Sequence, residues 1–134
     1  MKKVILVMSL LCFVTLGFSQ TEAKAKKEKP KKPEVVFDSL SYNYGKIVKG
    51  SPGECTFKFT NKSKSPLILT NVKASCGCTT PSWPKEEIKP KKSGEIQVKY
   101  NTNNVGYFTK TISVYTNKQE APIVLTISGQ VVEQ

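Results

Sequence analysis

The sequence contains no histidine and no arginine, although it has 134 residues and its basic side chains number 21. Without histidine, hydrolytic triads of the Ser-His or Cys-His kind cannot form, and zinc loses a common nitrogen ligand. Without arginine, the chain lacks the side chain used for bidentate recognition of phosphates and bases. We therefore predict a protein that is not an enzyme, has no resident metal or cofactor and has no nucleic-acid partner.

The first 19 residues have the pattern of a secretory signal peptide. Lys2 and Lys3 precede an apolar run over 4–16, and Gly17 and Ser19 supply the small residues of a cleavage site. The apolar run is shorter than the roughly 20 residues that span a bilayer, which disfavours a retained membrane anchor. We predict cleavage after Ser19, a mature chain that begins at Gln20, and a periplasmic or secreted location.

Residues 20–34 differ in composition from the rest of the chain. They are rich in lysine, glutamate, alanine and proline, and no apolar side chain among them is larger than alanine. Such a segment buries too little surface to offset the entropy of ordering, so we predict a disordered linker. Its favoured role is that of a solubilising spacer, and the alternative is electrostatic contact with an anionic envelope surface.

From Val35 onward, short apolar stretches are separated by Gly, Pro, Asn and Ser, which is typical of an all-β sandwich. The clearest alternation places Cys55, Phe57 and Phe59 on the core side of one strand. We predict one immunoglobulin-like β-sandwich of about seven strands over residues 35–134. Strands are expected over 35–40, 42–48, 54–60, 67–72, 96–100 and 107–116, with a last long strand through 123–127.

Glycine and proline predict local irregularities in these strands. Gly45 marks one in the second strand, and Ser51-Pro52-Gly53 is expected to turn with Gly53 at positive φ. A bulge near Thr70-Asn71 would return Val72 to the core face. Three prolines within residues 80–90 predict that this segment takes little part in a sheet.

Several segments carry a family resemblance. They are Phe57-Lys58-Phe59-Thr60-Asn61, Pro66 to Val72, Ser75-Cys76-Gly77-Cys78-Thr79, Ile88-Lys89-Pro90, Gly94 to Val98 and Gly106 to Ile112. With them the chain resembles the bacterial domain of unknown function 1573 family over roughly residues 35–131. The resemblance implies an exported immunoglobulin-like module similar to PapD and the major sperm protein, and it implies no established activity. Lys91 stands where family members usually carry glycine.

The cysteines that remain after loss of Cys12 with the signal peptide are Cys55, Cys76 and Cys78, so at most one internal disulfide can form. A Cys76–Cys78 bridge is sterically open because Gly77 is permissive, but so small a ring contributes only roughly 1.6 kcal/mol. A bridge from Cys55 to either partner would contribute roughly 3.4 kcal/mol. The family resemblance favours the first bridge, because Cys55 lies outside the motif.

Two functional hypotheses follow. The first is an exported, non-catalytic binding or structural module whose partner is an envelope protein or polymer, engaged through a strand edge or the Cys-Gly-Cys face. The alternative is a thiol site at Cys76 and Cys78 for disulfide exchange or copper(I), which accepts two or three thiolates.

A candidate binding surface comprises the aromatic residues Trp83, Tyr107 and Tyr115, which are expected to face outward. Outward aromatic side chains on a sandwich can receive a glycan, a peptide strand or another domain. The competing interpretation, favoured above all for Trp83, is that these rings pack under the proline-rich loop.

Overall fold

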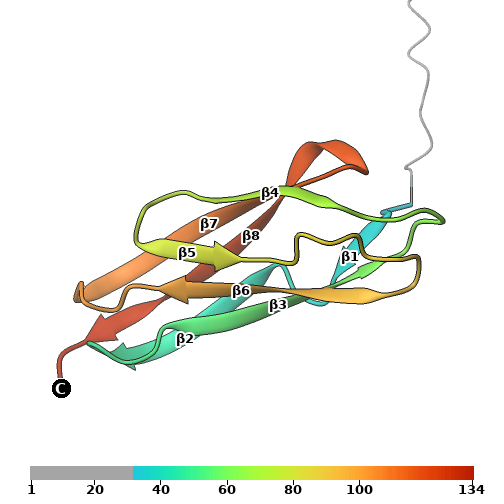
Figure 1. Cartoon of the computed structure of the whole chain (residues 1–134). Coiled ribbons are helices and arrows are strands. Elements are labelled where there is room, and N and C mark those ends of the chain that lie inside the picture. The colour runs from blue at the N-terminus through green and yellow to red at the C-terminus, as the bar shows by residue number, and fades with distance from the viewer. Residues whose placement is uncertain (1–31) are drawn as a thin grey trace, which may run out of the picture. The chain divides into compact units, whose positions relative to one another are not determined.

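The computed structural model describes residues 32–134, so the predicted signal peptide and the linker up to residue 31 lie outside the described residues. Two four-stranded sheets pack face to face, with strand orders β1-β3-β6-β5 and β2-β8-β7-β4 (Figure 1). The strands are β1 (Val35–Phe37), β2 (Ser41–Val48), β3 (Glu54–Asn61), β4 (Leu69–Ala74), β5 (Thr79–Ser82), β6 (Ser93–Tyr100), β7 (Gly106–Thr116) and β8 (Gln119–Val132). The predicted all-β sandwich is confirmed, with eight strands in place of about seven.

No helix within residues 32–134 is long and apolar enough to cross a membrane.

The core lies between the two sheets and follows the alternation of the sequence. In β3, the inward side chains of Cys55, Phe57 and Phe59 are buried, while the residues between them are exposed. The two layers also meet through aromatic stacking, since the rings of Tyr100 in β6 and Phe108 in β7 lie 3.8 Å apart between centroids. Such a pair contributes about 0.5–1.5 kcal/mol beyond the area that it buries.

The chain changes sheets between β1 and β2, which explains why the first strand is shorter than predicted. The Asp38 N–H still donates to the Lys58 carbonyl of β3 at 3.0 Å, whereas the Leu40 carbonyl already accepts from Thr126 of β8 at 2.8 Å. The strand expected to reach Leu40 therefore ends at Phe37. From this point β2 runs parallel to β8 at the edge of the second sheet.

Both predicted strand irregularities are present. The pairing of β2 with β8 shifts between Asn43 and Lys46, and Gly45 lies inside this bulge with φ of 64°. The pairing of β4 with β7 shifts between Leu69 and Asn71, and Val72 is buried as a result. In each case an extra residue restores the inward face of the strand.

Two predictions about glycine and proline were wrong. Gly53 does not adopt a positive φ; in this loop Gly50 does, at 79°. Gly53 is required for close approach instead, since a Cβ there would collide with the Tyr100 carbonyl oxygen and lie 2.9 Å from Thr102 Cγ2. Pro81 belongs to β5 and pairs with Val98, which is tolerated because β5 is an edge strand.

Lys91 occupies a left-handed turn after the proline-rich segment, with φ of 64°. Its N–H donates to the Asn61 carbonyl at 2.8 Å, so the turn is tied to the end of β3. A glycine would adopt this backbone conformation without the steric cost of a Cβ, which accounts for the glycine expected there by resemblance.

Candidate functional site at the Cys-Gly-Cys turn

The Cys-Gly-Cys turn is the corner at which the chain passes from β4 in one sheet to β5 in the other. Cys76 and Cys78 are joined by a disulfide, with their Cα atoms 5.3 Å apart, and Gly77 between them is exposed. The Asn101 N–H donates to the Cys78 carbonyl at 2.8 Å and fixes the turn to the chain that follows β6. Covalent and hydrogen bonds therefore hold this corner in one conformation.

Cys55 is buried and takes no part in the disulfide. It pairs with Val98 of β6, and Val98 in turn pairs with Pro81 of β5. Two strand spacings, or about 10 Å, therefore separate Cys55 from β5. A disulfide needs Cα atoms within about 7 Å, so the alternative of a Cys55 bridge does not fit this fold.

A cleft of about 530 Å³ adjoins the turn. Its walls are the segment 50–54 that leads from β2 into β3, the turn residues Gly77 and Cys78 with Thr80, and the segment 99–103 at the end of β6. The connections after β2, β4 and β6 lie at the same end of the sandwich, which brings these three parts of the chain together (Figure 1). Loops held by a rigid scaffold are where binding residues concentrate.

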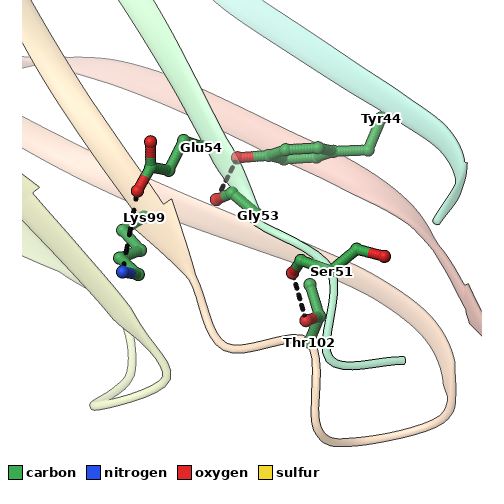
Figure 2. Close-up of polar contacts among 6 residues, drawn as sticks. All are labelled: Tyr44, Ser51, Gly53, Glu54, Lys99 and Thr102. Atoms are coloured by element: carbon green, nitrogen blue, oxygen red, sulfur yellow. Dashed lines mark hydrogen bonds and ion pairs between the residues drawn. The ribbon is translucent and has the colours of Figure 1, made fainter. Parts of the chain in front are cut away.

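Polar contacts fix the shape of this cleft, as Figure 2 shows. The Thr102 hydroxyl donates to the Ser51 carbonyl at 2.7 Å, and ties two of the three walls together. Tyr44 of β2 adds a further contact, since its hydroxyl donates to the Gly53 carbonyl at 2.9 Å.

Charged groups also line the cleft. Lys99 Nζ lies 3.6 Å from Glu54 Oε1 across β6 and β3 (Figure 2). Both side chains are well exposed, so this pair contributes little to stability but remains accessible to a ligand. The cleft thus offers one acid, one amine, hydroxyl groups and glycine-rich backbone.

Burial controls the protonation of three groups near this end of the molecule. Desolvation raises the pKa of Tyr44, and the adjacent Cys55 thiol raises it further. Burial also raises the pKa of Cys55, although the hydrogen bond with Tyr44 opposes that effect. Burial alone raises the pKa of Tyr100. The Cys55 thiol is accordingly a poor nucleophile in the folded protein.

These shifts predict a loss of stability in alkaline solution. In the unfolded chain the thiol and phenols ionise near their ordinary pKa values of about 8.5 and 10. In the folded protein these three groups stay protonated to higher pH, so the free energy of unfolding should fall as pH rises above about 8.5. We expect urea midpoints to decrease from pH 7.5 to 10.5, with Cys55 alkylated only upon unfolding. A constant midpoint, or rapid alkylation of the native protein, would contradict this prediction.

The three aromatic residues predicted as a binding surface lie apart from the cleft. Trp83 packs against the core, with Lys85 Nζ 3.0 Å from its ring centroid. Its indole N–H is the one buried side-chain group within residues 32–134 that has no hydrogen-bond partner. Tyr115 is half-buried on β7, and Tyr107 is 85% exposed on the same strand. Their role in binding stays a prediction.

Sequence reasoning did not identify Glu54, Lys99 or Thr102 as parts of a site. Glu54 and Lys99 both occupy outward positions of alternating strands, which the sequence shows. That they lie next to each other depends on the register between β3 and β6. No group of three or more Cys, His, Asp or Glu side chains in the described part of the chain could hold a metal ion. In the disulfide form, Cys76 and Cys78 supply no thiolate either.

The family described as "Protein of unknown function (DUF1573)" matches residues 35–131. The chain belongs to this family. The match covers the whole sandwich except its last residues, and it confirms the resemblance noted in the sequence. A comparison of this DUF1573 domain with curated proteins finds no match.

Solved structures share the fold of this DUF1573 domain. A protein of unknown function from Porphyromonas gingivalis W83 has a TM-score of 0.63 at 18% identity, and the match covers 72% of this chain. This chain spans only 46% of that protein. The ASH/PapD-like domain 7 of human CEP192 also has a TM-score of 0.63, at 12% identity. That match covers 80% of this chain and 94% of the CEP192 domain. The Pseudomonas aeruginosa CupB2 chaperone has a TM-score of 0.54 at 8% identity. That match covers 72% of this chain and 55% of the chaperone.

Proposed function

We propose that this domain is an exported, non-catalytic protein-binding module of the cell envelope. It binds an extended segment or loop of a partner protein in the cleft beside the Cys-Gly-Cys turn. The observation that carries this proposal is the rigidity of the cleft. The disulfide closes the turn that forms one wall, and the Asn101–Cys78 and Thr102–Ser51 hydrogen bonds join the three walls.

The side chains of the cleft are better suited to binding a peptide than to catalysing a reaction. Its volume of about 530 Å³ lies within the range of ligand sites, about 300–1,000 Å³. The Glu54–Lys99 pair can exchange its ionic contact for one with a partner, and the exposed Thr80 can offer its hydroxyl to a peptide backbone. The whole sequence lacks histidine, which removes the usual general base. PapD-like chaperones with this fold, such as CupB2, are consistent with a protein partner.

Export is supported by the signal-peptide pattern over residues 1–19 and by the Cys76–Cys78 disulfide, which suits an oxidising compartment. The exported protein should begin at Gln20. N-terminal sequencing of protein recovered from the cell envelope or medium tests this, and a chain that retains residues 1–19 would contradict cleavage.

Site-specific photo-crosslinking in cells tests the binding surface. A crosslinking residue at Thr80, which is exposed in the cleft, should form a discrete protein adduct upon irradiation. The matched control is Lys64, an equally exposed residue in the loop at the other end of β3. An adduct at Thr80 that is lost with Lys99→Glu supports the proposal. Equal adducts at both positions, or none at Thr80, would refute it.

A thiol function is a second candidate, because the disulfide lies in an exposed turn rather than in the core. In such an exchange, a partner dithiol would reduce the Cys76–Cys78 bond and become a disulfide itself. Equilibration with glutathione buffers separates the two roles. A structural bridge stays oxidised at potentials down to about −300 mV, whereas an exchanging bridge is reduced near −180 to −270 mV.

Copper(I) binding requires the reduced pair, since both thiolates are its ligands. The reduced protein should then bind one copper(I), and Cys76→Ser should abolish that binding. Absence of copper from the reduced wild type excludes the copper function without affecting the peptide-binding proposal.

A further inference from the structure

The outer face of β2, β8 and β7 carries a second surface, separate from the cleft. Two cross-strand rows of side chains lie on it. Asn43, Ser128 and Thr109 form one row, and Lys46, Gln130 and Tyr107 form the next. A cavity of about 330 Å³ opens between them.

The bulge at Gly45 widens the gap between the two rows. It puts two residues of β2, Tyr44 and Gly45, opposite the single residue Gly129 of β8, and Gly45 has no side chain to fill the gap. A Cβ at Gly45 would meet no atom within 4 Å, which shows that the space above it is open. Phe108 is also in the lining, but its ring packs on Tyr100 on the core side of the sheet.

The lining side chains are free to bind a ligand. Within the described residues, Lys46, Thr109 and Gln130 make no side-chain hydrogen bond or ion pair. The side-chain oxygen Oδ1 of Asn43 accepts from the Gly45 N–H at 2.8 Å, so the side-chain NH2 group of Asn43 can donate to a ligand. Tyr107 is 85% exposed, the largest exposed fraction among the big apolar side chains in residues 32–134.

A single exposed aromatic ring is ordinary on a protein surface. Tyr107 differs because hydroxyl and amide groups and a cavity surround it, an arrangement that suits a flat polyhydroxylated ring. The amphipathic tyrosine can stack on the C–H face of a sugar while neighbouring polar groups bond its hydroxyls. The absence of arginine disfavours nucleic acid, and the scarcity of apolar groups disfavours a protein core interface.

The charge of this surface favours acidic sugars over neutral ones. The two rows contain one lysine and no acidic side chain, and Glu133, near the end of β8, already pairs with Lys49. Lys46 and Tyr107 are separated by one strand, about 10 Å, which is the span of two adjoining sugar units. A polymer that contains uronate units would therefore place one ring against Tyr107 and the carboxylate of a neighbouring ring near Lys46.

We propose that the face around Tyr107 binds an acidic polysaccharide, with one sugar ring stacked on Tyr107 and the carboxylate of a neighbouring uronate bound by Lys46. This site is independent of the protein-binding cleft at the Cys-Gly-Cys turn. The two surfaces together would allow one domain to link a protein to an envelope polymer.

Titration calorimetry of the purified protein at 0.15 M salt tests this proposal. The probes are polygalacturonate, alginate and hyaluronate, with neutral dextran as the comparison. We expect binding to at least one uronate polymer and none to dextran. Tyr107→Ala should weaken that binding about tenfold, and Tyr107→Phe, which keeps the ring, should weaken it by less than about threefold. Lys46→Gln should weaken it about threefold or more.

Matched variants separate stacking from general attraction to a basic protein. Val124→Ala removes an exposed apolar side chain of β8 that does not line the cavity, and Lys62→Gln removes an exposed lysine from the far loop. Both should bind like the wild type, and near-UV circular dichroism should show every variant folded. The proposal is overturned if no uronate polymer binds, if dextran binds equally, or if Lys62→Gln and Lys46→Gln weaken binding alike while Tyr107→Ala has no effect.

Discussion

Replacing Phe59 with alanine is expected to lower the free energy of unfolding by about 3–5 kcal/mol. The Phe59 side chain is fully buried in β3, and its ring covers Gly94 of the neighbouring strand. A Cβ at Gly94 would lie only 2.5 Å from Phe59 Cζ, so the two residues fit as a large and small pair. Alanine would leave a cavity between the sheets that the strands, held by their ladder, cannot close.

Urea unfolding followed by tryptophan fluorescence measures this effect. Phe37→Ala is the matched control, because its ring lies 5.5 Å from that of Phe59 but is half-buried at the edge of the sheet. We expect the control to lose about 1–2 kcal/mol. Typical domains are stable by about 5–15 kcal/mol, so the Phe59 variant should be close to unfolding at 37 °C. Equal losses for the two variants would show that the sandwich interior is not closely packed around Phe59.

Asn61→Asp is the second prediction with a large effect, about 3 kcal/mol of lost stability at neutral pH. The side chain of Asn61 is fully buried at the end of β3. Its amide nitrogen donates to the carbonyls of Ser65 and Ile88 at 2.9 and 2.8 Å. Its amide oxygen accepts from the Ser63 N–H at 3.0 Å and from the Ser63 hydroxyl at 2.7 Å. Aspartate keeps the shape but replaces both donors with a charged oxygen that faces two carbonyls.

The loss should depend on pH. Burial beside carbonyl oxygens raises the pKa of the introduced carboxyl above its unfolded value, about 3.9. Between the unfolded and the folded pKa, the folded variant binds more protons than the unfolded chain. Its free energy of unfolding therefore falls as pH rises through this range. Urea titrations at pH 4.5 and 7.5 should show a smaller deficit at pH 4.5. Asn71→Asp, an exposed position in β4, should change stability by less than about 0.5 kcal/mol at either pH. A pH-independent deficit would argue against burial of the carboxyl.

Local patterns in the sequence predicted most of the sandwich. Alternation identified the inward residues of β3, because side chains of a strand point to opposite faces in turn. The bulge before Val72 was predictable because the apolar pattern loses its phase there. The first strand was predicted too long, since Leu40 continues the apolar composition beyond Asp38 and Ser39, and the change of sheet after Phe37 shows only in the hydrogen bond of Leu40 to β8.

The candidate site was predicted only in part. The Cys-Gly-Cys motif was conspicuous, and its disulfide was one of the alternatives that the cysteines allowed. The other walls of the cleft come from segments 50–54 and 99–103, which carry no motif. No local pattern in the sequence indicated the role of Asn61, whose buried hydrogen bonds join two loops.

The sequence by itself determined the fold class, the family and the faces of the strands, because these depend on the period of apolar residues and on local motifs. Tertiary structure alone decided which strands are neighbours. Alternation specifies a face but no partner, so the parallel pairing of β2 with β8 and the distance of Cys55 from the turn were not encoded locally. The cleft beside Cys78 depends on the pairing of β3, β6 and β5, and the surface around Tyr107 depends on the pairing of β2, β8 and β7.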